Sequence, residues 1–272
     1  MKKYHIGFNT GIKKEAKVDA PSMACERVTE PKKSVVQVYF PHRGTGWAYY
    51  NDSFDLKVGD FVYVDGKLEG YRGRVTEVNY SFKIKISDYK KVTAVIDTDV
   101  KGDFYLAGLH VVSFDQNTIP YSKVINWFKA PENDEEYASG NDDTNRFPLD
   151  DLSAMNISHI AADRGHEYYT ENRVSYIELD GTRGHAVVEG SENYEIEFDF
   201  TGGEISNLKC SCFCSGACKH EFAALLQLKE SLALITENYY NEYNDYFAII
   251  SKDVFMNTVM NKKVSGKISL EV

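Results

Sequence analysis

The chain has 272 residues, of which 43% are hydrophobic and 13% aromatic, so packed cores are expected and general disorder is excluded. At roughly 150 residues per domain, this length predicts two domains or one large one. The formal net charge of −10 argues against nucleic-acid binding by the charge of the whole molecule, although it is compatible with a local basic face. No run of about 18 apolar residues and no apolar signal-peptide core occur, so we expect a cytoplasmic protein with no membrane partner.

The first 33 residues show little periodicity beyond a short edge strand expected from Tyr4 to Phe8. From Ser34 onward, short β-rich segments follow one another, separated by Gly, Asp and Asn. They are VVQVYF, GWAYYN, DFVYVDG, YRGRVTEV, FKIKIS, KKVTAVID, FYLAG and HVVSFD. Because no helical pattern lies between them, they predict a small antiparallel sheet or barrel within residues 1–130.

The stretch LKVGDFVYVDGKLEGYRGRVTEV, residues 56–78, carries the clearest turn signals of this unit. The signals are a turn at Gly59-Asp60, a hairpin turn at Asp65-Gly66, and glycines at Gly70 and Gly73 that allow a kinked strand. This placement of glycines and valines resembles the SH3-like or OB-like small barrels found in many nucleic-acid and ribosome-associated proteins. The resemblance covers about 45 residues.

Residues 131–151, PENDEEYASGNDDTNRFPLDD, contain eight acidic residues and one arginine, a net charge of −7. Such a composition resists collapse and predicts a solvated linker, with a regulatory acidic tract as the alternative. The sequence therefore divides into a β-rich domain at 1–130, an acidic linker at 131–151 and a second domain at 152–272.

The second domain begins with two short helices expected between Leu152 and Val174, with Ser153 or Asn156 as a cap and Gly165 as a break. Strands are expected at VSYIELD, RGHAVVEG, YEIEFDF and EISNLKC, and a helix at HEFAALLQLKESLALI. Residues 236–260 predict one or two further helices, and the tail KVSGKISLEV a terminal strand. The fold class expected for the whole chain is α+β, with a barrel-like first domain and a helical C-terminal extension.

Four of the five cysteines fall within nine residues, in the segment CSCFCSGACKH. Cys210 and Cys212 are two apart at the end of a strand, so both thiols face the same side. Cys218 and His220 are two apart at the entrance to a helix. Structural zinc requires four nitrogen or sulfur ligands in a tetrahedron, and these four residues can supply them. In a reducing compartment such a cluster indicates Zn²⁺ rather than disulfides, with buried or redox-labile thiols as the alternative.

This C-x-C, five-residue gap, C-x-H spacing matches the SWIM zinc finger, and the resemblance extends over residues 157–230 or so. Its upstream part rests on Arg164-Gly165, Tyr168-Tyr169, Val174, Gly190-Ser191 and Tyr194. The resemblance implies zinc binding and a role in nucleic-acid or protein interaction, often beside helicase-like ATPases or transposases. This chain has no P-loop and is not expected to be such an ATPase.

Cys214 is one ligand candidate too many for a four-ligand site. We expect it to be a bystander, although it could replace Cys212. Cys25 is a lone thiol for which a bystander role is expected, and His166 is expected to be structural.

The first domain mixes aromatic and basic residues in a strip that also includes Tyr39 and His42. Stacking and phosphate contact are expected from Arg43, Trp47, Tyr49, Tyr71, Arg72 and Arg74. The alternative is that alternate aromatics simply fill the barrel core. Residues 34–130 carry 12 Lys and Arg against 11 Asp and Glu, whereas residues 157–232 carry 6 against 13.

These patterns predict a non-enzymatic zinc-binding module that acts as a nucleic-acid, specifically DNA-associated, accessory protein. The alternative is a protein-interaction adaptor that docks on a partner such as a helicase-like ATPase. The acidity of the finger region favours the adaptor, whereas the aromatic and basic strip favours nucleic acid. No HExxH or GxSxG motif occurs, and thiol chemistry is disfavoured because no acid–base partners accompany the cysteines.

Overall fold

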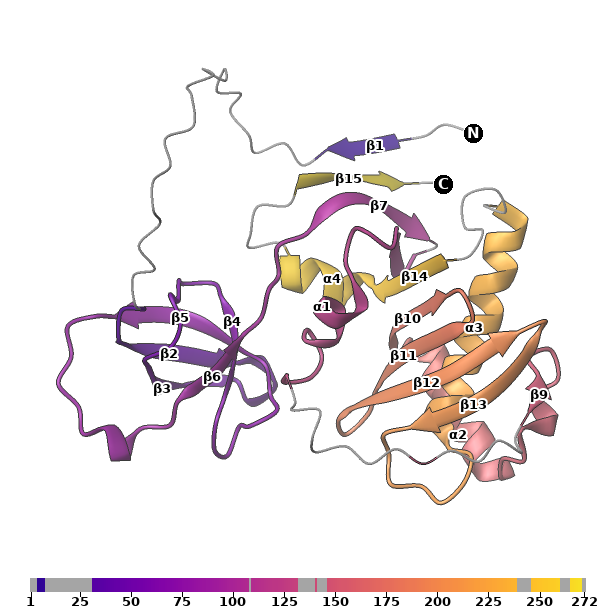
Figure 1. Ribbon diagram of the computed structural model, residues 1–272, viewed down its shortest axis with the longest axis horizontal. Coiled ribbons are helices and arrows are strands. Elements are labelled where there is room, and N and C mark those ends of the chain that lie inside the picture. The colour runs from indigo at the N-terminus through magenta and orange to yellow at the C-terminus, as the bar shows by residue number, and fades with distance from the viewer. Residues whose placement is uncertain are drawn as a thin grey trace.

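The computed structural model describes residues 4–7, 31–107, 109–131, 140, 146–238, 246–259 and 265–270. Within these residues the chain forms two sheets and four α-helices, which confirms an α+β fold (Figure 1). Cys25 and most of the acidic residues of the expected linker lie outside the described residues. No helix in the described part of the chain is long and apolar enough to cross a membrane.

The smaller sheet contains five strands in the order β3-β2-β5-β4-β6. Its strands are β2 (Ser34–Phe40), β3 (Thr45–Asn51), β4 (Phe61–Val64), β5 (Gly73–Asn79) and β6 (Val92–Val95). In β2 every second residue is buried, so Val36, Val38 and Phe40 point into the core while the residues between them face outward. A bridge joins Tyr50 of the edge strand β3 to Lys91, directly before the other edge strand β6, so the sheet curls toward a barrel.

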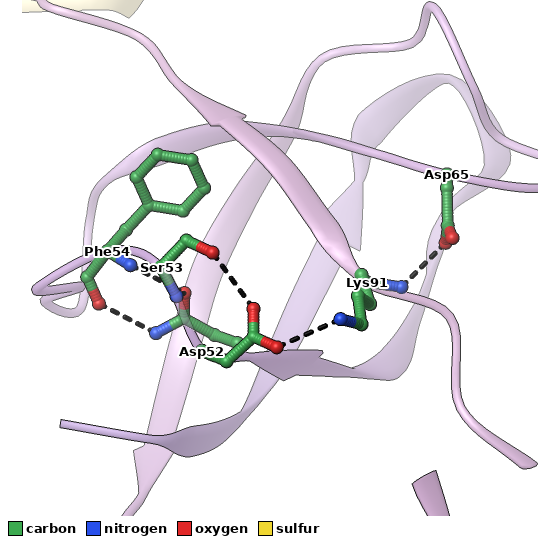
Figure 2. A network of polar contacts seen from close by, with 6 residues as sticks. Asp52, Ser53, Phe54, Asp65 and Lys91 are labelled. Atoms are coloured by element: carbon green, nitrogen blue, oxygen red, sulfur yellow. Dashed lines mark hydrogen bonds and ion pairs between the residues drawn. The ribbon is translucent and has the colours of Figure 1, made fainter. Parts of the chain in front are cut away.

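Figure 2 shows the polar network at this seam. The backbone N–H of Lys91 donates to the Asp65 carboxylate at 2.6 Å. The side-chain ammonium group of Lys91 lies 2.9 Å from the Asp52 carboxylate. Beside them, Asn51 is fully buried, and its amide donates to Ser34 Oγ and to the Phe54 carbonyl. The seam is therefore closed by hydrogen bonds from side chains as well as by the strand bridge.

The larger sheet has ten strands among the described residues, in the order β1-β15-β7-β8-β14-β10-β11-β12-β13-β9. The strands are β1 (Tyr4–Gly7), β7 (Lys101–Ala107), β8 (Val111–Phe114), β9 (Phe147–Pro148), β10 (Val174–Asp180), β11 (Arg183–Glu189), β12 (Asn193–Thr201), β13 (Glu204–Cys210), β14 (Tyr246–Ser251) and β15 (Ser265–Leu270). All neighbours are antiparallel except β15 and β7. The strands expected at both ends of the chain are therefore present as β1 and β15.

The helices are α1 (Tyr121–Ile125), α2 (His159–Thr170), α3 (Lys219–Asn238) and α4 (Lys252–Val259). A core that includes Ile177, Leu225 and Phe247 lies on the side of the sheet that α2 and α3 cover. A second core, which includes Phe104, Trp127 and Phe255, lies on the other side with α1 and α4 (Figure 1). The large sheet is thus buried on both faces near its middle.

Two segments differ from the structure expected from the sequence. Residues 101–114, expected among the strands of the small antiparallel sheet or barrel, instead form β7 and β8 of the larger sheet, and β8 pairs with β14 from the far end of the chain. Residues 246–251, expected to be helical, form that strand. Its residues alternate between the two cores, with Phe247 on one side and Ala248 on the other. A strand buried on both faces is a continuous apolar run, which resembles a helix segment in the sequence.

The barrel packs against the larger sheet. Its Phe61 and Tyr63 belong to the same core as Phe255 of α4. Tyr63 donates a hydrogen bond to the Asn126 carbonyl. At the end of the expected linker, Phe147 and Leu149 are buried in the core that α2 and α3 cover, so these linker residues are not solvated. The division at 131–151 otherwise stays a prediction.

Candidate metal centre

The four expected ligands come from the end of one strand and the beginning of one helix. Cys210 ends β13 and is held in register by its pairing with Ile196 of β12. Cys218 directly precedes α3, and His220 lies in the first turn of that helix. The intervening loop turns the chain back, so the two pairs face each other as the spacing predicts.

A reciprocal cap fixes the start of α3. The Glu221 N–H donates to Cys218 Sγ at 3.4 Å, and the Glu221 carboxylate accepts from the Cys218 N–H at 2.8 Å. This is the capping box, with a cysteine in the position that serine or threonine usually holds. Sequence reasoning missed Glu221, although the Cys-x-x-Glu spacing before an apolar helix is its signal.

The donor atoms of Cys210, Cys212, Cys218 and His220 all lie within 4.8 Å of one another. Both Cys210 Sγ and Cys218 Sγ are 3.8 Å from His220 Nδ1. Sulfur and nitrogen ligands of a tetrahedral zinc ion would be about 3.6 Å apart, given bonds of about 2.3 and 2.0–2.1 Å. The four residues can therefore hold a metal ion, with Nδ1 as the histidine ligand atom.

The surroundings of the donors set their protonation. The pKa of His220 is lowered to about 4 by burial and by the neighbouring charge of Lys219, so the ring is neutral, as a ligand must be. Burial, with smaller effects from the other cysteines, raises the pKa of Cys212 to about 12. Hydrogen bonding to Cys210 and then burial raise the pKa of Cys218. A cation is therefore needed to hold these sulfurs as thiolates, and its binding must release protons.

Two tyrosines orient the His220 ring. Tyr194 of β12 stacks on it at 3.9 Å between ring centroids, and Tyr168 of α2 meets it edge-on at 5.5 Å. The Tyr194 hydroxyl lies 2.7 Å from Ser191 Oγ. A Cβ on Gly190 would lie 2.8 Å from the Tyr194 ring, so a glycine is required there for the tyrosine to reach the histidine.

Contrary to the expectation from the sequence, Gly165 does not break the chain into two helices, because α2 continues through it and packs closely there against the start of α3. A Cβ at this position would lie 2.8 Å from the Lys219 carbonyl and 2.9 Å from Phe222 Cβ. Residues that carry the upstream resemblance, Gly165, Tyr168, Gly190, Ser191 and Tyr194, thus surround the start of α3.

Cys214 lies outside the donor set and is exposed. Beside it, Phe213 is fully exposed on the same loop. His166 contacts Tyr169 edge-on, at 6.2 Å, rather than the cysteines.

The structure separates the six residues expected to bind nucleic acid. Trp47 and Tyr71 are exposed by 43% and 40%, and Arg43 is exposed as well. Tyr49 is only 5% exposed and belongs to the barrel core, as the core-filling alternative predicts. Arg72 donates to the Trp127 carbonyl and to Thr258 Oγ1, so it holds the barrel against the larger sheet.

His42 adds to the exposed group, because its ring stacks on Tyr71 at 4.4 Å and 19°. The rings of His42 and Trp47 both lie about 6 Å from that of Phe40, at 6.1 and 6.0 Å. We refer to His42, Trp47 and Tyr71 as the aromatic patch. Arg74, half-buried on β5, pairs across the strands with the exposed Tyr39.

Comparison of the chain with protein-family models, curated proteins and solved structures finds no match. The resemblance to the SWIM finger therefore stays a prediction, and the metal centre stands on its geometry.

Proposed function

We propose that this protein is a non-enzymatic, zinc-stabilised module that binds nucleic acid through its barrel. The observation that carries the proposal is the aromatic patch with Arg43 beside it. Large rings exposed together at one end of a small barrel are suited to base stacking, and adjacent guanidinium groups to phosphate contact.

The donor chemistry supports zinc with a structural role. Three thiolates and an imidazole are ligands that Zn²⁺ prefers, whereas calcium and magnesium prefer oxygen. Four protein ligands complete a tetrahedron and leave no position for a reacting water. The metal would fix the end of β13 to the start of α3 and close this edge of the core.

The test is binding of the purified, metal-loaded full chain to single- and double-stranded DNA and RNA across a salt series. We expect binding that weakens with salt, because phosphate contacts release counterions. An absence of binding to all four probes at low salt would reject the proposal.

A second candidate, a protein-interaction adaptor, is favoured by Phe213. This side chain is fully exposed on the loop between the two pairs of candidate ligands. The surrounding residues 157–232 are acidic, with 6 basic against 13 acidic residues. A photo-crosslinking residue at position 213 would identify the partner, and Phe213→Ser should then weaken binding to that purified partner. If Phe213→Ser binds the partner with unchanged affinity, the loop around Phe213 is not the docking surface.

A further inference from the structure

We propose that the aromatic patch selects single-stranded over double-stranded nucleic acid, by stacking unpaired bases on Trp47 and on the paired rings of His42 and Tyr71. This inference rests on the proposed nucleic-acid function and assigns its substrate class and contact residues.

The rings are placed for successive contacts. His42 lies in the turn at Pro41–Arg43 that connects β2 to β3, and Tyr71 lies just before β5. Trp47 lies on β3 and contacts the same Phe40 as His42 does. The core ring of Phe40 thus supports two separate exposed ring groups at one end of the barrel, within reach of neighbouring nucleotides.

The charge of the barrel favours stacking as the main source of affinity. Residues 34–95, which contain the five strands of the barrel, are close to neutral, with 9 basic against 7 acidic residues. Two of the three arginines expected to contact phosphate, Arg43 and Arg74, remain for that role, because Arg72 is bound to Trp127 and Thr258. A duplex hides the faces of its bases and offers mainly phosphates, whereas a single strand offers faces to every exposed ring.

Tyr39 is a separate exposed ring on the outer side of the same sheet, because Trp47 is the cross-strand neighbour of the inward-facing Val38 and therefore lies on the other side. The cross-strand neighbours of Tyr39 are Gly46 on β3 and Arg74 on β5. Because Gly46 has no side chain, no cross-strand side chain flanks Tyr39 in the direction of β3. In the direction of β5, Tyr39 is flanked by Arg74. This arrangement suits a base on the tyrosine with its phosphate near the arginine.

The experiment uses the metal-loaded full chain and a 20-nucleotide oligo(dT), alone and as a duplex with oligo(dA). We expect tighter binding of the single strand, with a log–log salt slope of about −1.4 for two phosphate contacts. Trp47→Ala and Tyr71→Ala should each lower its affinity about 5- to 100-fold. The matched control is Tyr80→Ala, because Tyr80 is 52% exposed on the barrel but makes none of the patch contacts.

A spectroscopic readout does not depend on whether the alanine variants fold. The chain has two tryptophans, and Trp127 is only 1% exposed. Stacking on Trp47 should therefore quench part of the tryptophan fluorescence of the wild-type protein when oligo(dT) is added. Trp47→Phe should still bind but lose this quenching.

The outcomes separate the two proposals. If no nucleic acid binds, both the proposed function and this inference fail. If nucleic acid binds but the duplex binds as tightly as the single strand, or binding leaves Trp47 emission unchanged, only the stacking inference fails.

Discussion

At the residue scale, Cys218 combines two roles. Its sulfur accepts the Glu221 N–H as a helix cap, and the same sulfur is a candidate metal ligand. The positive end of the α3 dipole favours negative charge at this position. The Cys210 sulfur, burial and the Glu221 carboxylate together raise the pKa of Cys218 by more than the Glu221 N–H lowers it, so a bound metal ion is needed to stabilise the thiolate.

The ligand set can be checked one residue at a time. Replacing Cys210, Cys212, Cys218 or His220 should remove the metal, because a structural zinc site requires all four donors. Cys214→Ser should keep close to one zinc per chain, since Cys214 is exposed and outside the donor set. Elemental analysis of purified variants measures this. Retention of zinc in Cys212→Ser, together with its loss in Cys214→Ser, would show that Cys214 is the ligand.

Gly165 provides a second test at this scale. Alanine normally stabilises a helix interior by about 1 kcal/mol relative to glycine. Here the new Cβ would lie 2.8 Å from the Lys219 carbonyl, so we expect Gly165→Ala to lower the free energy of unfolding by about 1–3 kcal/mol instead. Urea unfolding measures the difference. Gly216→Ala, where no atom lies within 4 Å of the new Cβ, is the control and should be close to neutral. A stabilised Gly165→Ala would mean that α2 and α3 pack less closely.

At the scale of elements, β10 carries a buried acid. Glu178 is 4% exposed and accepts a hydrogen bond of 2.6 Å from the Tyr176 hydroxyl. Burial, with a smaller effect of Asp180, raises its pKa above the ordinary value of 4.5, although the Tyr176 bond opposes this. Because the folded state binds this proton more tightly than the unfolded chain does, stability should fall as pH rises from 4.5 through the raised folded-state pKa.

The variant Glu178→Gln removes this titration. Its free energy of unfolding, relative to wild type, should therefore increase as the pH is raised above 4.5. Urea unfolding at several pH values measures the relative slope, with the exposed Glu197→Gln as control. Parallel pH profiles for wild type and Glu178→Gln would contradict a raised pKa at this position.

At the scale of the whole molecule, Arg72 connects the barrel to the larger sheet. Its guanidinium donates to the Trp127 carbonyl at 3.1 Å and to Thr258 Oγ1 at 2.9 Å, and it lies over the Phe61 ring. Arg72→Leu should lower the free energy of unfolding by about 1–3 kcal/mol, because two buried polar partners lose their bonds. Its affinity for oligo(dT) should stay unchanged. Arg74→Leu, two residues further along the chain on β5, should show the reverse pattern. Loss of affinity in folded Arg72→Leu would place Arg72 in the binding surface.

Metal removal should affect one part of the molecule more than another. The ligands border the core formed by β10–β13 and α3, whereas the barrel interior around Val38 and Val75 is a separate cluster. After chelation we expect faster hydrogen exchange in β13 and the first turns of α3, with β2 and β5 still protected. Equal loss of protection in both cores would show that the metal stabilises the whole fold.

The local features were predictable from the sequence. The alternating apolar residues of β2, the glycine turns of the barrel and the C-x-C and C-x-H spacings each depend on a few neighbouring residues. The periodicity of a strand or helix determines on which face of that element each of its side chains lies. These local patterns therefore indicated most of the strands, although not β14, together with the helix α3 and the four candidate metal ligands, without knowledge of distant contacts.

Only the tertiary structure decided which segments share a sheet, and which of the residues expected to contact nucleic acid are buried instead. One of the two partners of β8 is β14, more than a hundred residues away, and no local pattern specifies that pairing. The same holds for Tyr49 and Arg72, which look like binding residues in the sequence but lie in the barrel core and at its junction with the larger sheet. Burial is a property of packed surfaces that come from separate parts of the chain, so residue type and spacing alone could not determine it.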